Sequence, residues 1–183
     1  CGVGFIANVE GQTNHWVLSQ AIRGLSCMEH RGGCGGDGDS GDGAGILCEI
    51  PWSYLKEVWK SAKQCDSQST GVGMIFMPKD LKNRKLAKKI CEEEASYLGL
   101  TSQGWRDVPV NEGVLGKLAK ENEPFIAQWL VDIDDLEVNL EALLFRLKQR
   151  ISNRANIELK EDELGLYICC LLYTSDAADD TPC

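Results

Sequence analysis

The chain has 183 residues, of which 43% are hydrophobic and 26% charged, a composition typical of one globular domain. Its formal net charge of −9 argues against nucleic-acid binding, because phosphate contacts require clustered Lys and Arg. No apolar run approaches the roughly 20 residues of a membrane-spanning helix. Nine cysteines without a C-x-x-C pair, and only two histidines, form no zinc or disulfide pattern and favour a reducing compartment.

The first part of the chain predicts a strand, a helix and a loop. Residues 2–9 are apolar and punctuated by glycine, and they predict a buried strand. Thr13 is expected to cap a helix that ends near Met28. Residues 29–45 predict a loop rich in Gly and Asp, and residues 46–50 predict a short strand.

The remainder alternates helices and strands. Residues 52–63 predict a helix, residues 71–77 a second buried strand, and Asp80 the cap of a helix that ends near Leu98. The blocks of helices and strands predict layered α/β or α+β packing. Further expected elements are an extended edge segment at 105–110, a strand at 124–131, a helix capped by Asp134 or Asp135 with an apolar stripe of Leu136, Leu140, Leu143, Leu144, Leu147 and Ile151, and a strand at 164–169.

The first residue is the strongest candidate for catalysis. Cys1 carries a thiol, whose pKa is ordinarily about 8.5, beside its own α-amino group, whose pKa is roughly 7.7–8.0. An N-terminal amine of this kind can act as the general base for the side chain of the same residue. Two alternatives remain: residue 1 is only where the sequence begins, or Cys1 is the acylated first residue of a lipoprotein. The apolar segment that follows is unlike the polar tether of a lipoprotein.

The glycine-rich loop does not match the common ligand-binding motifs. Gly36-x-Gly38-x-x-Gly41 precedes a predicted strand and does not open a helix, unlike a dinucleotide fingerprint. A calcium loop counted from Asp37 fails at three of its fixed positions, and no Gly-Lys-Ser/Thr follows for a P-loop. Glycines here permit a tight backbone path, which is compatible with a substrate pocket. The guanidinium of Arg31 can bond carbonyls or carboxylates near the N-terminus.

Several motifs together resemble the N-terminal glutaminase domain of the glutamate synthase family, which is a class II glutamine amidotransferase. The variant Arg31-Gly32-Gly33-Cys34-Gly35 is most similar to ferredoxin-type members. The matching segments, which span nearly all of residues 1–169, are Cys1-Gly2-Val3-Gly4-Phe5, His30-Arg31-Gly32-Gly33, Gly41-Asp42-Gly43-Ala44-Gly45-Ile46, and residues 70–80, 104–110 and 166–169.

The resemblance implies an α+β fold of the N-terminal-nucleophile hydrolase type, a four-layer αββα sandwich that is incomplete here at its C-terminal side. It implies that Cys1 attacks the side-chain amide of glutamine and releases ammonia. The turn formed by His30, Arg31 and Gly32 would support the nucleophile loop, and Asp42 and Gly43 would shape the pocket.

The resemblance also implies partners and cofactors outside this segment. The full-length enzyme would carry FMN and an iron–sulfur cluster, take electrons from ferredoxin or an NAD(P)H-linked donor, and use the ammonia to convert 2-oxoglutarate to glutamate. No cofactor is expected in residues 1–183 themselves, and no nucleic-acid or membrane partner. The implied location is the plastid stroma or the bacterial cytoplasm.

The end of the sequence departs from the family. Class II amidotransferases use an Asn-Gly pair for the oxyanion hole, and this chain contains none. Residues 1–169 are therefore interpreted as the N-terminal part of the domain. Residues 170–183 are interpreted as a non-native tail, because residues 170–179 equal the translation of a common transposase sequencing adapter. Alone, the chain is expected to have negligible glutaminase activity.

Two other functions are compatible with the sequence. One is another class II branch, such as the amidophosphoribosyltransferase, asparagine or glucosamine-phosphate enzymes. The other is a binding or vestigial module that keeps the fold without the chemistry. Residues 71–80 and 104–110 favour glutamate synthase over the other branches.

Overall fold

The computed structural model describes residues 2–12, 14–65, 68–133, 138–159 and 165–172. The chain divides into two compact units. Unit 1 contains residues 1–48 and 111–122, and unit 2 contains residues 49–110 and 123–183.

Unit 1 is built from short helices and loops. Its longest helix, α1 (His15–Cys27), is followed by a 3-10 turn, η1 (Glu29–Arg31), and the second segment of the unit adds η3 (Glu112–Val114) and α4 (Lys117–Glu121). The predicted helix before residue 28 is thus confirmed. The side chain of Asn14 caps α1 by accepting a hydrogen bond from the Trp16 N–H, whereas the predicted cap, Thr13, lies outside the described residues.

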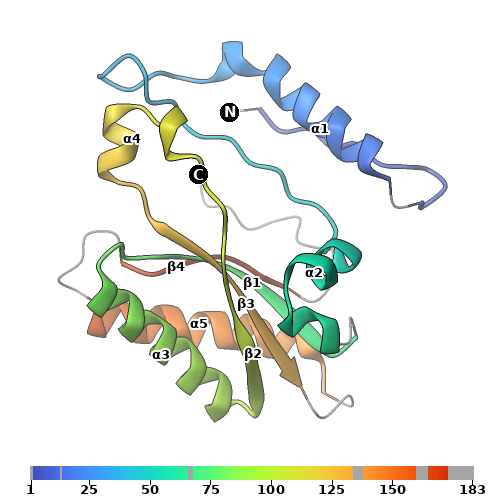
Figure 1. Ribbon diagram of the computed structural model, residues 1–183, viewed down its shortest axis with the longest axis vertical. Helices are drawn as coiled ribbons and strands as arrows, with labels where there is room; N and C mark the ends of the chain where they lie inside the picture. Colours follow the sequence, from blue (N-terminus) through green and yellow to red (C-terminus); the bar gives the residue numbers. More distant parts are fainter. Residues whose placement is uncertain (1, 13, 66–67, 134–137, 160–164, 173–183) are drawn as a thin grey trace. The chain divides into compact units, whose positions relative to one another are not determined.

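Two predicted strands in this part of the chain are wrong. Residues 2–9 and 46–50 are not strands (Figure 1). The side chains of Val3 and Phe5 in the first segment are 96% and 94% exposed. An extended segment becomes a strand only when a neighbour completes its hydrogen-bond ladder. No other segment among the described residues pairs with either run, so their apolar sequence alone does not produce a strand.

Unit 2 is organised around a four-stranded antiparallel sheet. The strands have the order β2-β3-β1-β4, so β2 and β4 form the edges (Figure 1). The predicted strands at 71–77 and 124–131 are confirmed, as is the edge position expected before Pro109. Bounds are β1 (Thr70–Met77), β2 (Leu100–Asp107), β3 (Phe125–Ile133) and β4 (Tyr167–Leu172), which continues beyond the predicted end at residue 169.

The helices of unit 2 follow the predicted apolar patterns, with changes at their ends. Asp80 caps α3 (Leu81–Tyr97) through a 2.8 Å bond from the Asn83 N–H, as predicted. Asn139 caps α5 (Leu140–Glu158), because it accepts a bond from the Ala142 N–H. The predicted caps at 134 and 135, and the apolar residue at 136, lie outside the described residues. The single helix expected at 52–63 is instead α2 (Trp52–Val58) followed by the 3-10 turn η2 (Ser61–Gln64).

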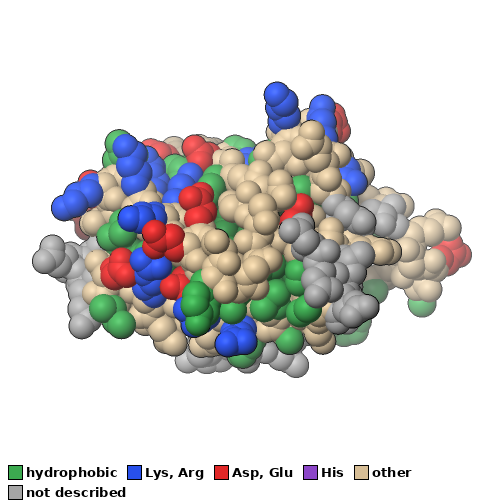
Figure 2. All heavy atoms as spheres, turned by 90° about the horizontal axis from the view of Figure 1, so that it is seen from below, with side chains coloured by type: hydrophobic (Ala, Val, Ile, Leu, Met, Phe, Trp, Pro, Cys, Tyr) green, Lys and Arg blue, Asp and Glu red, His purple; other side chains and the backbone are tan. Residues whose placement is uncertain are grey.

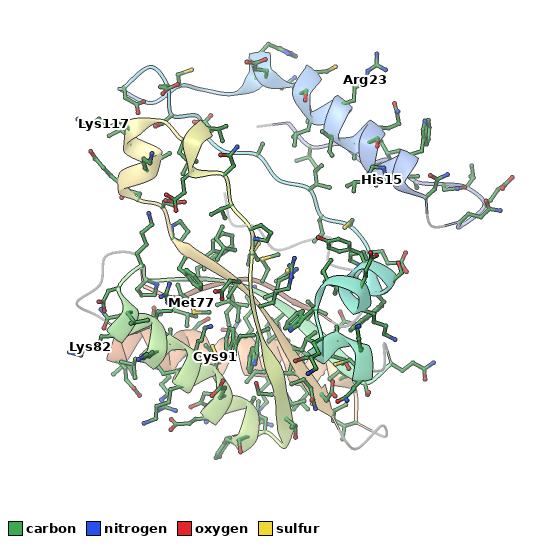
Figure 3. The ribbon with its side chains drawn as sticks, in the orientation of Figure 1. His15, Arg23, Met77, Lys82, Cys91 and Lys117 are labelled. Atoms are coloured by element: carbon green, nitrogen blue, oxygen red, sulfur yellow. The ribbon has the colours of Figure 1, made fainter. Side chains whose placement is uncertain are left out.

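Helices cover both faces of the sheet. On one face, α3 and α5 bury a large core to which Met77 and Cys91 belong (Figure 3). On the other face, α2 and η2 pack Leu55 and Trp59 against Leu130, which points opposite to its neighbours in β3. Fully buried members of the main core include Ile75, Met77, Ile90, Cys91, Trp129, Leu147 and Ile151. The architecture is α+β, as predicted, with one antiparallel sheet among the described residues.

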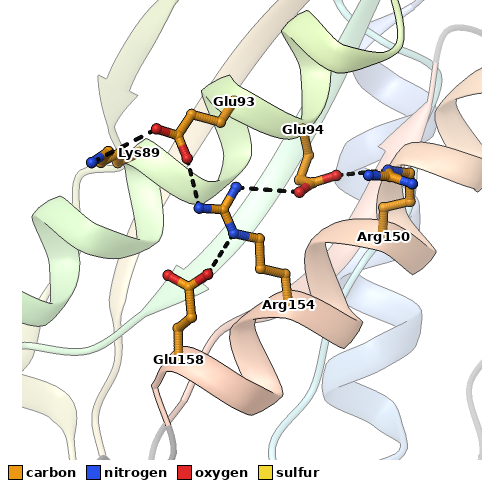
Figure 4. A network of polar contacts seen from close by, with 6 residues as sticks. All are labelled: Lys89, Glu93, Glu94, Arg150, Arg154 and Glu158. Atoms are coloured by element: carbon orange, nitrogen blue, oxygen red, sulfur yellow. Dashed lines mark hydrogen bonds and ion pairs between the residues drawn. The ribbon is translucent and has the colours of Figure 1, made fainter.

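An ion-pair network joins the two long helices on their outer side. Glu94 of α3 accepts hydrogen bonds from Arg150 at 2.6 Å and Arg154 at 3.2 Å, both from α5 (Figure 4). Arg154 also pairs with Glu93 and Glu158, each at 2.6 Å. Figure 2, in which this helical layer faces the viewer, shows acidic and basic side chains side by side. Of the three carboxylates Glu94 is the most buried, so it is the centre of the network.

We expect replacement of Glu94 by Gln to lower the free energy of unfolding by about 1–3 kcal/mol, because two charge-assisted hydrogen bonds are weakened at a buried position. Lys89→Ala is the matched control: its 3.7 Å pair with Glu93 is exposed and should contribute less than about 1 kcal/mol. Urea titration of the two variants measures both changes. Equal effects would show that Glu94 is not the centre of the network.

Candidate functional site

The predicted nucleophile, Cys1, lies outside the described residues, but Gly2, the residue bonded to it, is described. A Cβ atom on Gly2 would lie 2.9 Å from Sδ of Met28 and 3.5 Å from Cδ of Arg31. The backbone that follows Cys1 therefore lies against the turn η1, where the sequence placed the supporting residues. The lack of a side chain at residue 2 allows this contact.

His30 and Arg31 are held by the 3-10 turn that follows α1. Nδ1 of His30 lies 3.1 Å from the carbonyl oxygen of Cys27, and because that oxygen can only accept, Nδ1 carries the proton in this bond. The Gly32 N–H bonds the carbonyl of Glu29 and closes the turn. All three predicted residues are exposed, so the turn presents their polar groups at the surface of unit 1.

Asp42 lies next to the same turn. One of its carboxylate oxygens accepts a 2.7 Å hydrogen bond from the N–H of Gly33, the residue directly after the predicted turn. Gly43 follows with φ +86°, a backbone conformation that favours glycine. The predicted site residues Gly32, Asp42 and Gly43 are thus brought together by the folding of the glycine-rich loop.

Sequence reasoning missed a second cluster in this loop. The carboxylate of Asp37 accepts bonds from the hydroxyl and the N–H of Ser40, at 2.6 and 2.9 Å. It also accepts a 3.0 Å bond from the N–H of Leu118 in α4, and the Ser40 hydroxyl accepts one of 3.0 Å from Ala119. The Asp-x-x-Ser spacing indicates the local turn, but nothing in the sequence signals the contact with α4.

These hydrogen bonds keep Asp37 ionised. The N–H of Leu118, followed by the hydroxyl and N–H of Ser40, holds the pKa of this carboxyl well below its usual range. A carboxyl with a lowered pKa stabilises the fold fully above its unfolded pKa, and that contribution is lost only as the pH falls through the lower, folded value. The cluster is therefore intact at neutral pH.

The described residues also form a surface hollow outside this loop. A surface hollow of about 520 Å³ in unit 2 is lined by residues of α3 and β2, and none of the predicted site residues takes part in it. No group of three or more His, Cys, Asp or Glu within the described ranges could hold a metal ion. Among the same residues, no helix is long and apolar enough to cross a membrane.

Comparison with known proteins identifies the family. The model of the class II glutamine amidotransferases matches residues 1–175. The chain belongs to this family. A class II amidotransferase is what the sequence motifs predict, and the match includes Cys1, the turn at 30–32 and the loop at 42–43.

Curated relatives of this amidotransferase chain are ferredoxin-dependent glutamate synthases. It is 43% identical to the chloroplastic/mitochondrial enzyme 1 of Arabidopsis thaliana, 48% to enzyme 2 of a Synechocystis strain, and 40% to the chloroplastic enzyme of Spinacia oleracea. The alignments cover 93%, 72% and 93% of this chain. They cover only 11%, 8% and 11% of those proteins, so the chain spans about a tenth of its relatives' length.

Proposed function

We propose that this chain is the N-terminal part of the glutaminase domain of a ferredoxin-dependent glutamate synthase. The observation that carries the proposal is the match of the class II amidotransferase model to residues 1–175, which include Cys1. The identities of 40–48% to ferredoxin-dependent enzymes favour this branch over other class II amidotransferases.

The proposed reaction begins at Cys1. Its α-amino group accepts the thiol proton while the sulfur attacks the side-chain carbonyl carbon of glutamine. The resulting tetrahedral intermediate expels ammonia, which leaves with a proton from the same amine, and a γ-glutamyl thioester remains. Water then attacks the thioester, releases glutamate and restores the thiol. The step needs neither an oxidant nor a metal ion.

The described loop supplies support for this nucleophile in the proposal. Arg31 lies beside Gly2, and the turn at 30–32 would fix the path of the backbone that leads to Cys1. Asp42, which is bonded to Gly33, would hold the loop wall of the glutamine pocket, with Gly43 providing the turn.

The activity of the whole protein belongs to the same proposal. In a glutamate synthase, other domains would use the ammonia to form glutamate from 2-oxoglutarate, with FMN and an iron–sulfur cluster and with electrons from ferredoxin. The chloroplastic and cyanobacterial relatives favour the plastid stroma or the bacterial cytoplasm as location.

We also infer that the complete domain forms the four-layer αββα sandwich of N-terminal-nucleophile hydrolases, and that residues 170–183 are a non-native tail. In the structure Cys170 and Leu171 pair with Met74 and Gly73, so backbone pairing alone does not set this boundary. Sequencing the genomic locus across codon 169 decides it. A frame that continues into an Asn-Gly segment supports the inference, and a locus that encodes residues 170–183 and then stops contradicts it.

Covalent labelling tests the glutaminase proposal. The full-length protein is incubated with 6-diazo-5-oxo-norleucine, a glutamine-mimicking electrophile, and digested for mass spectrometry. We expect one adduct, on Cys1, with a free α-amino group in untreated protein and with protection by glutamine. Absence of the adduct from Cys1 would favour a binding or vestigial module without catalytic activity. Acylation of Cys1 would indicate a lipoprotein.

A further inference from the structure

We propose that Asp37 and Ser40 are positioning residues for the glutaminase site, because they fasten the glycine-rich loop to the segment at 116–119. The inference rests on the proposed function and extends it to residues without a known role. We call the contacts of Asp37 and Ser40 with each other and with Leu118 and Ala119 the loop latch.

The loop latch joins segments that are distant in the sequence. Asp37 and Ser40 lie in the glycine-rich loop, whereas their partners Leu118 and Ala119 lie in the first turn of α4, 81 and 79 residues later in the sequence. The cap residue of α4, Gly116, has no side chain with which to satisfy the first N–H groups of the helix. The side chains of Asp37 and Ser40 satisfy two of them instead, so the loop and the helix end order each other.

The packing around Ser40 shows that the loop latch is built closely. Ser40 is buried, although most of the surrounding loop is exposed. A Cβ atom on Gly116 would lie 2.5 Å from the Ser40 hydroxyl oxygen and 2.6 Å from its backbone nitrogen. The two segments therefore approach to a distance that only glycine permits.

In the sequence, the loop latch residues Asp37 and Ser40 are flanked by candidate-site residues a few positions before and after them. Gly35 donates a 2.6 Å bond to the Ser40 carbonyl, and Cys34 forms an isolated antiparallel bridge with Gly41. This narrow loop leads directly to the Gly33–Asp42 bond. The contacts that hold Ser40 therefore also hold the two sides of the loop, one of which carries Gly32 and the other Asp42. A displacement of about 1 Å at a reacting centre can cost a hundredfold in rate.

The test compares two electrophiles on Cys1 in the full-length protein. For Asp37→Asn and Ser40→Ala, we expect labelling by 6-diazo-5-oxo-norleucine to slow about 10- to 100-fold, because this reagent needs an ordered glutamine pocket. Labelling by iodoacetamide, which needs only an accessible thiol, should change less than about twofold. The double variant should be no slower than the slower single variant, since both residues act through one unit.

Asp39→Asn is the matched control. Asp39 is in the same loop and has the same charge, but it contributes only its backbone N–H to Asp37. We expect wild-type rates with both reagents. An Asp37→Asn rate equal to wild type, or an equal loss with both reagents, would overturn the positioning role.

Hydrogen exchange separates this inference from the proposed function. In Asp37→Asn and Ser40→Ala, amides of residues 32–45 should exchange at least tenfold faster than in wild type and in Asp39→Asn. If Cys1 of the wild type does not react with the glutamine mimic, the proposed function and the positioning role both fail. If hydrogen exchange of residues 32–45 is the same in the variants as in wild type, the loop latch does not order the loop.

Discussion

Replacement of Cys1 by Ala in the full-length protein should abolish the release of ammonia from glutamine, with a loss of at least about four orders of magnitude. In the proposed mechanism, the sulfur of Cys1 forms the covalent intermediate and its own α-amino group serves as the general base, a pairing that an internal residue does not have. Ammonia production with saturating glutamine measures the loss. Formation of glutamate from 2-oxoglutarate and added ammonium should persist, because the role of Cys1 ends when ammonia is released.

Cys34→Ala provides the control for this experiment. Cys34 is an exposed thiol in the same glycine-rich loop, with no part in the proposed chemistry. We expect its glutaminase activity to stay within about threefold of wild type, an effect of roughly 0.6 kcal/mol on the barrier. Glutaminase activity retained by Cys1→Ala, or lost only in Cys34→Ala, would place the nucleophile elsewhere.

Trp129→Ala should give the largest loss of stability, about 3–5 kcal/mol. Trp129 is fully buried in β3, and its ring stacks on that of Trp105 with centroids 5.1 Å apart and planes 7° from parallel. Its indole N–H donates a 2.8 Å bond to the Ser102 hydroxyl. Truncation removes the stacking and the hydrogen bond and leaves a cavity between the sheet and its helices. Urea unfolding followed by far-ultraviolet circular dichroism measures the change.

Trp16→Ala separates a general effect of losing tryptophan from the packing effect. Trp16 is 60% exposed on α1, and its removal should change the free energy of unfolding by less than about 0.5 kcal/mol. A similar small change in Trp129→Ala would mean that the β2–β3 pair does not depend on this ring stack.

Much of unit 2 could be predicted from the sequence because α3, α5, β1 and β3 bury their own periodic patterns. By contrast, the helix expected at 52–63 is split, and β2 begins at Leu100, before the extended segment expected at 105–110. The stripe of Leu144, Leu147 and Ile151 faces the sheet, and the run at 71–77 lies in its centre. Caps were less predictable: Asp80 is the observed cap of α3, but Asn139, and not an aspartate at 134 or 135, caps α5. Several polar residues before a helix can serve as caps, and packing selects among them.

The sequence could suggest residues for the candidate site but not their contacts. The motifs predict that Arg31, Gly32 and Asp42 lie near Cys1, and this stays a prediction. The observed bond from Gly33 to Asp42 depends on the path of the intervening loop. The apolar runs at 2–9 and 46–50 failed as strands because pairing needs a partner, which no local pattern supplies. The hydrogen bond between Asp37 and Leu118 of α4 could not be predicted either, because no local sequence pattern signals that partner.

The order of strands in the sheet has a consequence for synthesis of the protein. β1 is central and pairs on one side with β3 and on the other with β4, where Ile75 lies opposite Ile168. A ribosome makes β1 long before β4, so a nascent chain exposes one edge of β1 until β4 has left the exit tunnel. Unpaired strand edges are templates for intermolecular pairing. Slow translation between β3 and β4 would therefore favour aggregation, and a chaperone that covers β1 would act in this interval.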